Sequence, residues 1–148
     1  AEGAVVWIGD LDVAAAESVA GGITATGGAA KAVALDVTKA QEVGGALRRI
    51  EAEHGRLDIL VNNAGLNVRS DFRHLGEADW QRIRDVNIDG VVRLARDCFD
   101  LLKASGRASL INVSSIMAGR HLRQLAAYSA TKGAVTSLTR PLVIDCAR

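Results

Sequence analysis

The sequence predicts an α/β fold built on a doubly wound, Rossmann-like parallel sheet. Short apolar stretches read as buried strands, longer stretches of helical character separate them, and polar or small residues follow several strand ends. Strands joined by helices on this scale pair in parallel. We expect strands over four ranges: Val5–Asp10, Ala30–Leu35, Leu57–Val61 and Ala108–Val113.

The first of these strands ends in a carboxylate, Asp10. Ligands of open α/β sheets bind at the carboxyl ends of the strands, where a carboxylate can accept hydrogen bonds from both hydroxyls of an adenosine ribose. It would repel the 2′-phosphate of NADP. Asp10 could instead cap the next helix, but Asp12 lies directly before Val13 and is better placed for that role. We therefore predict that Asp10 binds the ribose and that the cofactor is NAD.

The second helix has clear boundary signals. Thr38-Lys39-Ala40-Gln41 fits a capping box, which predicts a helix start with Thr38 as the capping residue. The helix is expected to run to about His54 and to stop at Gly55, because glycine readily takes the left-handed conformation that ends helices.

The longest periodic stretch, Glu77–Ala104, predicts a helix with one apolar stripe. Asn87 falls inside that stripe, and a buried amide costs free energy unless its donors and acceptors are satisfied. The stripe alone leaves two interpretations of Asn87 open, a core residue bonded to nearby backbone or a functional residue. The stripe residues are Trp80, Ile83, Asn87, Val91, Leu94, Cys98 and Leu102.

Tyr128 and Lys132 stand one turn apart in a helix expected to begin near Leu125. This spacing puts both on the same helix face, with an ammonium beside a phenol. A fixed cation stabilises a phenolate, so the phenol could exchange a proton with a substrate near neutral pH. An incidental pair in an ordinary helix is the alternative. Ser115 ends the strand before this helix, and Ser114 is the competing hydroxyl.

Composition excludes several other classes of protein. The chain has 148 residues, 49% of them hydrophobic and 24% charged, with a formal net charge of +1, which gives no reason to expect nucleic acid or an anionic membrane as partner. No apolar run reaches the roughly 18 residues of a membrane span. Cys98 and Cys146 lack metal-site spacing, so we expect no metal and two buried free thiols in a reducing compartment, the cytoplasm. His54, His74 and His121 are expected at the surface.

The turn Asn62-Asn63-Ala64-Gly65, together with Ser115, Tyr128 and Lys132 at these spacings, resembles the short-chain dehydrogenase/reductase family over nearly the whole chain. The resemblance implies an NAD-dependent oxidoreductase that interconverts a secondary alcohol and a ketone. By resemblance Tyr128 exchanges the proton, Ser115 rather than Ser114 bonds the reacting oxygen, and Lys132 binds the nicotinamide ribose. Asn87 would hold a water that links Lys132 to solvent.

The resemblance also implies further cofactor contacts. Asp36 and Val37 would border the adenine ring. Asn63, Ala64 and Gly65 would lie along the cofactor, where small residues let the backbone approach and the Asn side chain braces neighbouring strands.

Family members carry an earlier strand with a glycine-rich turn, which holds the cofactor pyrophosphate, and further strands after the last helix. This chain lacks an initiating Met and contains no Gly-x-Gly-x-x-Gly. The resemblance therefore implies that residues 1–148 are a single partial domain, with a central strand missing between Val5–Gly9 and Leu57–Val61, and that the chain alone is inactive. Pro141 departs from the family pattern and predicts a kink or an end in the last helix.

The implied substrate is a small alcohol or ketone, with no nucleic acid or membrane partner. By resemblance the complete protein forms a homodimer or homotetramer through Glu77–Ala104 and the helix beginning near Leu125, which carry Leu101, Val135 and Leu138. Two rivals remain. One is an NADPH-linked reductase of the same family that acts on 3-oxoacyl thioesters, which Asp10 argues against. The other is a non-catalytic protein that keeps the fold.

Overall fold

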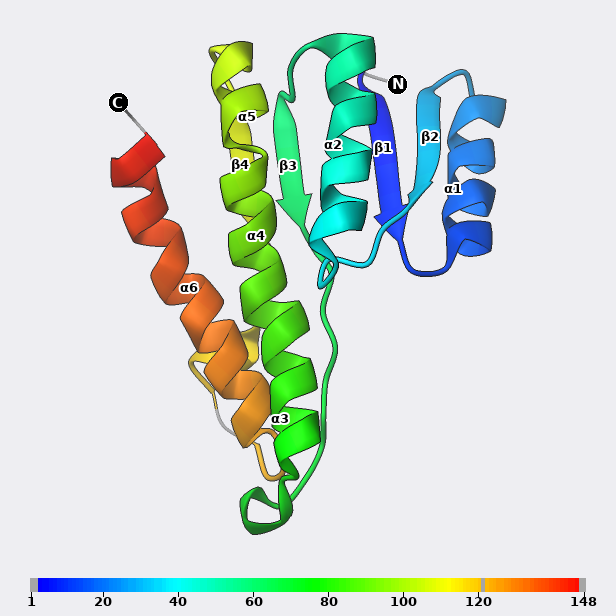
Figure 1. Cartoon of the computed structure of the whole chain (residues 1–148). Coiled ribbons are helices and arrows are strands. Elements are labelled where there is room, and N and C mark those ends of the chain that lie inside the picture. The colour runs from blue at the N-terminus through cyan, green and yellow to red at the C-terminus, as the bar shows by residue number, and fades with distance from the viewer. Residues whose placement is uncertain (1–2, 121, 147–148) are drawn as a thin grey trace.

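The computed structural model describes residues 3–120 and 122–146, with side chains as far as Leu142. Within that part of the chain, four strands form where the sequence predicts them, with ends that differ by one or two residues (Figure 1). The strands are β1 (Val5–Asp10), β2 (Ala29–Ala34), β3 (Ile59–Asn62) and β4 (Ser109–Asn112). His121 and the side chain of Cys146 lie outside the described residues.

Helices connect the strands. They are α1 (Val13–Ala25), α2 (Ala40–His54), α3 (Glu77–Arg84), α4 (Gly90–Asp97), α5 (Phe99–Ser105) and α6 (Ala126–Cys146). Two short 3₁₀ turns, η1 (Phe72–His74) and η3 (Ile116–Ala118), lie in loops. The single helix predicted over 77–104 is divided, because a π-helical turn, η2 (Asp85–Asp89), joins α3 to α4, and Cys98 separates α4 from α5.

The strands form two parallel pairs, which confirms the α/β fold with a parallel sheet. In β1–β2, Asp10 is paired with Ala34, and in β3–β4, Asn62 is paired with Asn112, so each pair ends at the same edge. Within the described residues, β1 and β3 do not pair with one another. The sheet is thus interrupted at the position where the sequence predicts the missing central strand.

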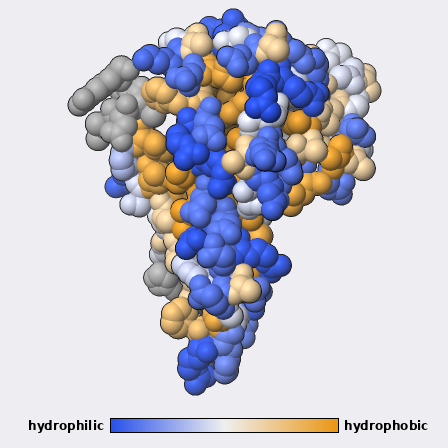
Figure 2. All heavy atoms as spheres, in the orientation of Figure 1, coloured by the Kyte–Doolittle hydropathy of each residue, from blue (hydrophilic) through white to orange (hydrophobic). Residues whose placement is uncertain are grey.

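The helices cover mainly one side of the strands. Figure 1 shows α2, α4 and α5 in front of them, and Figure 2 shows that the outer surfaces of these helices are largely hydrophilic. On the other side of β3 and β4 the apolar side chains of Ile59, Val61 and Ile111 are 55%, 52% and 48% exposed. Apolar sheet faces are normally buried, so this face lacks a covering layer in the described chain.

The predicted stripe of the long helix is buried in part. Ile83, Asn87, Val91 and Cys98 are buried as expected. Leu101 and Val135, which the sequence suggested for a contact between subunits, are 8% and 1% exposed and pack inside this chain. These two residues therefore do not form an association surface, Leu138 is half-buried, and the homo-oligomer stays a prediction from the resemblance.

One local prediction from the sequence was wrong, and so was one of the two alternatives predicted for Pro141. Thr38 does not cap α2, since the residue before the helix is Lys39 and no side chain caps it. Thr38 instead donates its hydroxyl and its backbone N–H to Asp36 Oδ1, at 2.7 and 2.8 Å. Pro141 does not end α6, which continues to Cys146.

Three other local predictions were right. Asp12 caps α1 by accepting a hydrogen bond from the N–H of Ala15. Gly55 ends α2 in the left-handed region, with φ of 65°. His54 and His74 are exposed, as expected of surface residues. Among the described residues, no helix combines the length and the apolar character needed to cross a membrane.

Candidate active site

The first turns of α6 bring the predicted acid–base pair together. Tyr128 packs against the buried cluster of Val68, Ile83 and Ala127, which fixes its ring. Lys132 Nζ lies 6.0 Å from the centre of that ring. This confirms that the two side chains share one helix face, as their spacing of four residues predicts.

Lys132 is a buried cation. Its side chain is 5% exposed, and Nζ donates a 2.7 Å hydrogen bond to the backbone carbonyl of Val113, at the end of β4. Within the described part of the chain it forms no ion pair. An ammonium has three protons to donate, and burying it with one carbonyl partner is costly. The position therefore favours a ligand that offers further oxygen acceptors.

The two serines after β4 have different roles. The Ser114 hydroxyl bonds α6, since it donates to the Lys132 carbonyl at 2.9 Å and lies 2.6 Å from Thr136 Oγ1. The Ser115 oxygen accepts the N–H of Met117 at 3.2 Å, which leaves its own hydrogen available. Ser114 thus ties the strand end to the helix, whereas the Ser115 hydroxyl donates to no group among the described residues, and the choice of Ser115 as the reacting serine stays a prediction.

Asn87 lies in the π-helical turn and is fully buried. Its Oδ1 accepts the N–H of Leu66 at 2.9 Å, and its Nδ2 donates to the Leu66 carbonyl at 2.9 Å and to Thr131 Oγ1 at 3.0 Å. Thr131 in turn donates to the carbonyl of Tyr128. Asn87 therefore joins the turn after β3 to the helix that carries Tyr128 and Lys132.

π turns often mark functional sites, because the extra residue changes the direction of the side chains around it. Both amide protons of Asn87 are donated to protein acceptors, so a bound water would have to donate a hydrogen bond to an oxygen of Asn87. The interpretation of Asn87 as a core residue bonded to nearby backbone is therefore confirmed, and its functional role beside Lys132 stays a prediction.

The turn after β3 lines a cavity of about 270 Å³. Its walls are formed by Asn63, Gly65, Leu66, Asn67, Val113, Ser114, Tyr128 and Lys132. A Cβ added at Gly65 would lie 3.4 Å from Asn87 Oδ1 and 3.5 Å from Lys132 Nζ. A larger residue would therefore enter the space in front of the ammonium, which explains a glycine at this position.

The residue that braces the strands is Asn62 and not Asn63. Asn62 is 3% exposed and donates to Asn112 Oδ1 at 2.8 Å, and Asn112 donates to Thr139 of α6 at 3.0 Å. Asn63 and Ala64 are exposed. Because side chains alternate along a strand, Asn62 faces the helices while Asn63 faces the cavity.

The second group of predicted residues lies at the ends of β1 and β2. Asp10 is exposed, and its Oδ1 accepts the N–H of Asp12 at 3.0 Å, which leaves Oδ2 available. Asp36 follows β2, where the hydroxyl of Thr38 holds the pKa of its carboxyl below the usual value and so keeps it ionised. Val37 is buried beside it, at 7% exposure.

These two groups mark the ends of one edge, with Tyr128 and Lys132 beyond β4 and β3 and the two aspartates beyond β1 and β2. A dinucleotide that crosses the carboxyl ends of a parallel sheet spans such an edge. The residues present fit its two ends. Lys132 can donate hydrogen bonds to ribose hydroxyls at one end, and Asp10 and Asp36 can accept hydrogen bonds at the other. Within the described residues no glycine-rich turn stands between the ends to bind a pyrophosphate.

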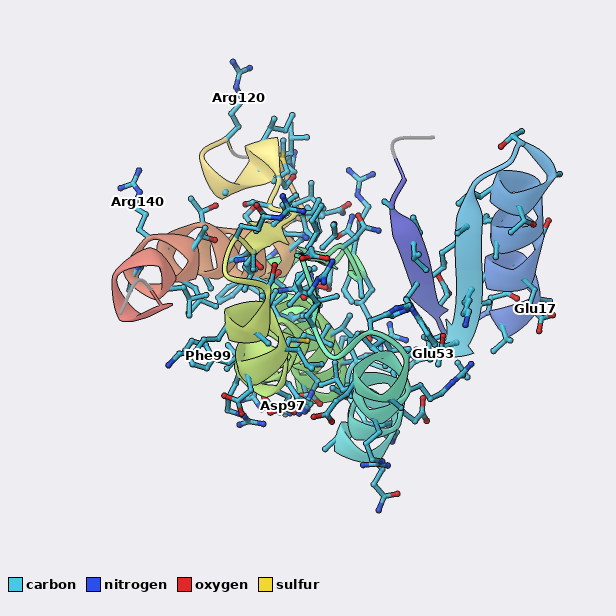
Figure 3. The ribbon with its side chains drawn as sticks, turned by 90° about the horizontal axis from the view of Figure 1, so that it is seen from above. Glu17, Glu53, Asp97, Phe99, Arg120 and Arg140 are labelled. Carbon is cyan, nitrogen blue, oxygen red and sulfur yellow. The ribbon has the colours of Figure 1, made fainter. Side chains whose placement is uncertain are left out.

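Several other groups contribute less to this site. Arg120, in the loop after Ser115, points away from the fold, which is typical of a solvated charge (Figure 3). Burial raises the pKa of the Cys98 thiol to about 12, with Asp97 adding to the effect, so this cysteine is inert. Among the described residues no three His, Cys, Asp or Glu side chains come close enough to hold a metal ion.

Sequence reasoning missed two residues of this site, Thr131 and Arg93. Thr131 lies between Tyr128 and Lys132 and is fully buried, and its spacing of three from Tyr128 could have suggested the bond it makes. Arg93 has the pattern of a solvated charge or a subunit contact on the helix surface, but it bonds the carbonyl of Val37, which lies 56 residues away in the sequence. No local pattern signals such a contact.

Comparison with known proteins gives a consistent result. The family model described as short chain dehydrogenase matches residues 1–148. The chain is 34% identical over 146 residues to the cyclopentanol dehydrogenase of Comamonas sp., covering 99% of this chain and 58% of that protein. It therefore spans less than two thirds of the length of this relative.

Solved structures agree in fold. A gluconate 5-dehydrogenase from Burkholderia cenocepacia, in complex with NADP and tartrate, is 35% identical with a TM-score of 0.90, over 99% of this chain and 57% of that one. A 7α-hydroxysteroid dehydrogenase, in complex with NADH and 7-oxo glycochenodeoxycholic acid, is 28% identical with a TM-score of 0.92, over 98% of this chain and 56% of that one. Both kinds of nicotinamide cofactor thus occur among similar structures.

Proposed function

This chain belongs to the short-chain dehydrogenase family, and from that membership we propose that the protein carrying it is an NAD-dependent oxidoreductase that interconverts a secondary alcohol and a ketone. The observation that carries the proposal is the placement of Tyr128 beside the buried ammonium of Lys132, in the wall of a cavity that is also lined by Ser114, the residue before Ser115. A phenol, a cation and a free hydroxyl donor are the groups that proton exchange with a carbonyl oxygen requires.

Each of these residues has a defined task in the proposal. Tyr128 exchanges the proton with the substrate oxygen, and Ser115 donates a hydrogen bond to the same oxygen, where negative charge develops during reduction. Lys132 stabilises the phenolate form of Tyr128 and bonds the hydroxyls of the nicotinamide ribose. Asn87 fixes the turn that forms the cavity wall and binds, through an oxygen, a water beside Lys132. The bound nicotinamide would supply the hydride.

At the other end of the edge, Asp10 accepts hydrogen bonds from the adenosine ribose hydroxyls, and Asp36 and Val37 border the adenine. Asn63, Ala64 and Gly65 lie along the cofactor between these ends. The exposed carboxylate of Asp10 favours NAD, because it would repel a 2′-phosphate. The complete protein would be a cytoplasmic homodimer or homotetramer.

An NADP-linked enzyme of the same family is the second candidate. One observation favours it, since the similar gluconate 5-dehydrogenase structure contains NADP. The charge at the end of β1 argues for the first candidate, and a comparison of the two cofactors decides between them.

The test uses the protein that carries this chain, at its full encoded length. We would titrate it with NADH and NADPH and then follow nicotinamide reduction with cyclopentanol and with gluconate, the substrates named for two similar proteins. Tighter binding of NADH and NAD reduction with at least one alcohol are expected. If the protein binds neither NADH nor NADPH, the assignment as an oxidoreductase is wrong.

A further inference from the structure

A side chain of α4 reaches the turn that follows β2. Arg93 Nη1 donates to the backbone carbonyl of Val37 at 2.5 Å, although 56 residues separate them in the sequence. A hydrogen bond from a charged donor is stronger than one between neutral groups. Neighbouring Arg96, by contrast, pairs with Asp97 at the surface, where its side chain is 70% exposed. The two arginines of one helix thus have different partners.

The helix backbone also fits closely against the same residue. A Cβ added at Gly90 would lie 2.7 Å from Val37 Cγ2, closer than real Cβ atoms approach, and 3.2 Å from Val37 Cβ, which is a tight contact. Gly90 therefore lets α4 approach the turn, and Arg93, nearly one helical turn further on, bonds its carbonyl. The side chain of Val37 thus packs against Gly90, and its carbonyl is bonded by a charged donor of the same helix.

The residues on either side of Val37 are held as well. The N–H of Asp36 donates to Glu42 Oε2 of α2 at 2.7 Å, and Thr38 donates twice to Asp36 Oδ1. The second carboxylate oxygen of Asp36 is not used by these bonds. The turn thus has a defined shape that presents one free carboxylate oxygen at the carboxyl end of β2.

We propose that Arg93 is a positioning residue for the adenine end of the dinucleotide, acting through the Val37 carbonyl. The inference rests on the proposed function, in which Asp36 and Val37 border the adenine. Asn87 and Gly90 lie on the same continuous helical segment as Arg93, so this segment fixes both ends of the cofactor edge. Its π turn lies at the nicotinamide end, and the guanidinium of Arg93 reaches the adenine end.

The test compares variants of the protein at its full encoded length. Arg93→Ala removes the bond, Arg93→Lys keeps a single donor, and Arg96→Ala is the matched control on the exposed side of the same helix. For each we would measure Kd for NADH and for reduced nicotinamide mononucleotide, which lacks the adenine, together with kcat at saturating cofactor.

We expect Arg93→Ala to raise the Kd for NADH about tenfold, the effect of losing a charged hydrogen bond transmitted in part to the ligand. The Kd for the mononucleotide and kcat should stay within about twofold of the parent values. Arg93→Lys should recover part of the affinity, and Arg96→Ala should bind as the parent does. If Arg93→Ala does not fold, a loss of NADH affinity in Arg93→Lys with unchanged mononucleotide binding supports the same conclusion.

Two results would overturn the inference. Unchanged NADH affinity in Arg93→Ala would show that Val37 needs no fixing, and an equal loss for both ligands would show general disruption rather than positioning. A parent protein that binds neither NADH nor NADPH would refute the proposed function itself, which separates the two failures.

Discussion

Replacing Asn87 by alanine should destabilise the protein strongly. The substitution removes three hydrogen bonds from a fully buried side chain, two to the backbone of Leu66 and one to Thr131 Oγ1. Each buried polar group left without a partner costs about 1–3 kcal/mol. Leu66 is only partly buried, so water can replace some of these bonds, and we expect a loss of about 3–5 kcal/mol. A whole domain is stable by about 5–15 kcal/mol, so this is a large fraction.

The assay is urea unfolding of the cofactor-free protein at its full encoded length. Asn67→Ala is the matched control, because Asn67 lines the same cavity but is exposed, and its replacement should cost less than about 0.5 kcal/mol. A loss below about 1 kcal/mol in Asn87→Ala would refute the reasoning. It would mean that the π turn keeps its shape without these bonds and that Asn87 acts only through water.

Three further predictions concern the cofactor, the buried thiol and the isolated chain. Asp10→Ala combined with Leu11→Arg should raise kcat/KM with NADP relative to NAD, because repulsion of the 2′-phosphate is removed and a cation added; a parent that already prefers NADP contradicts our assignment. Cys98 should resist alkylation in the native protein, and rapid labelling near neutral pH would contradict this. Because its pKa is raised from 9.0 to about 12 by folding, the contribution of the buried thiol to stability should be complete below pH 9.0 and should fall as the pH rises toward about 12. Residues 1–148 expressed alone should show no cooperative urea transition, because an apolar face of β3 and β4 is exposed and β1 and β3 do not pair with one another in the described chain. A sharp transition with saturable NADH binding would contradict this prediction.

Local signals were sufficient for most of the fold. The strands, the cap at Asp12 and the helix stop at Gly55 follow from apolar runs and from residues whose backbone preferences act within a few positions. The interruption between β1 and β3 also agrees with the strand order expected from the resemblance. These features depend on the nearest neighbours in sequence or on a known topology.

Features that depend on tertiary contacts were not predictable. Thr38 had a good capping pattern, yet the carboxylate of Asp36 competes for its hydroxyl. The π turn at Asn87 arises where the helix must bond Leu66, and a periodicity of 3.6 residues contains no sign of it. The same is true of Arg93, whose pattern on a helix surface is that of any solvated charge.

Part of the candidate site was accessible from spacing. Tyr128 and Lys132 met because helix geometry places residues four apart side by side. The choice between Ser114 and Ser115 had to come from the resemblance. The structure adds one physical observation, since the Ser114 hydroxyl donates its hydrogen bond to α6. Asn62 rather than Asn63 braces the strands because β3, which the sequence predicted to end at Val61, includes one further residue.

The most direct test of the account is the turnover of Tyr128→Phe, in the protein at its full encoded length, with its preferred cofactor and alcohol. The phenol hydroxyl is removed while the ring and its packing against Val68, Ile83 and Ala127 remain. We predict that kcat falls by at least about 10²-fold, the usual contribution of a general acid–base group, while the Kd for NADH stays within about twofold of the parent value. Turnover equal to that of the parent would show that Tyr128 does not exchange the proton and would contradict the proposed chemistry.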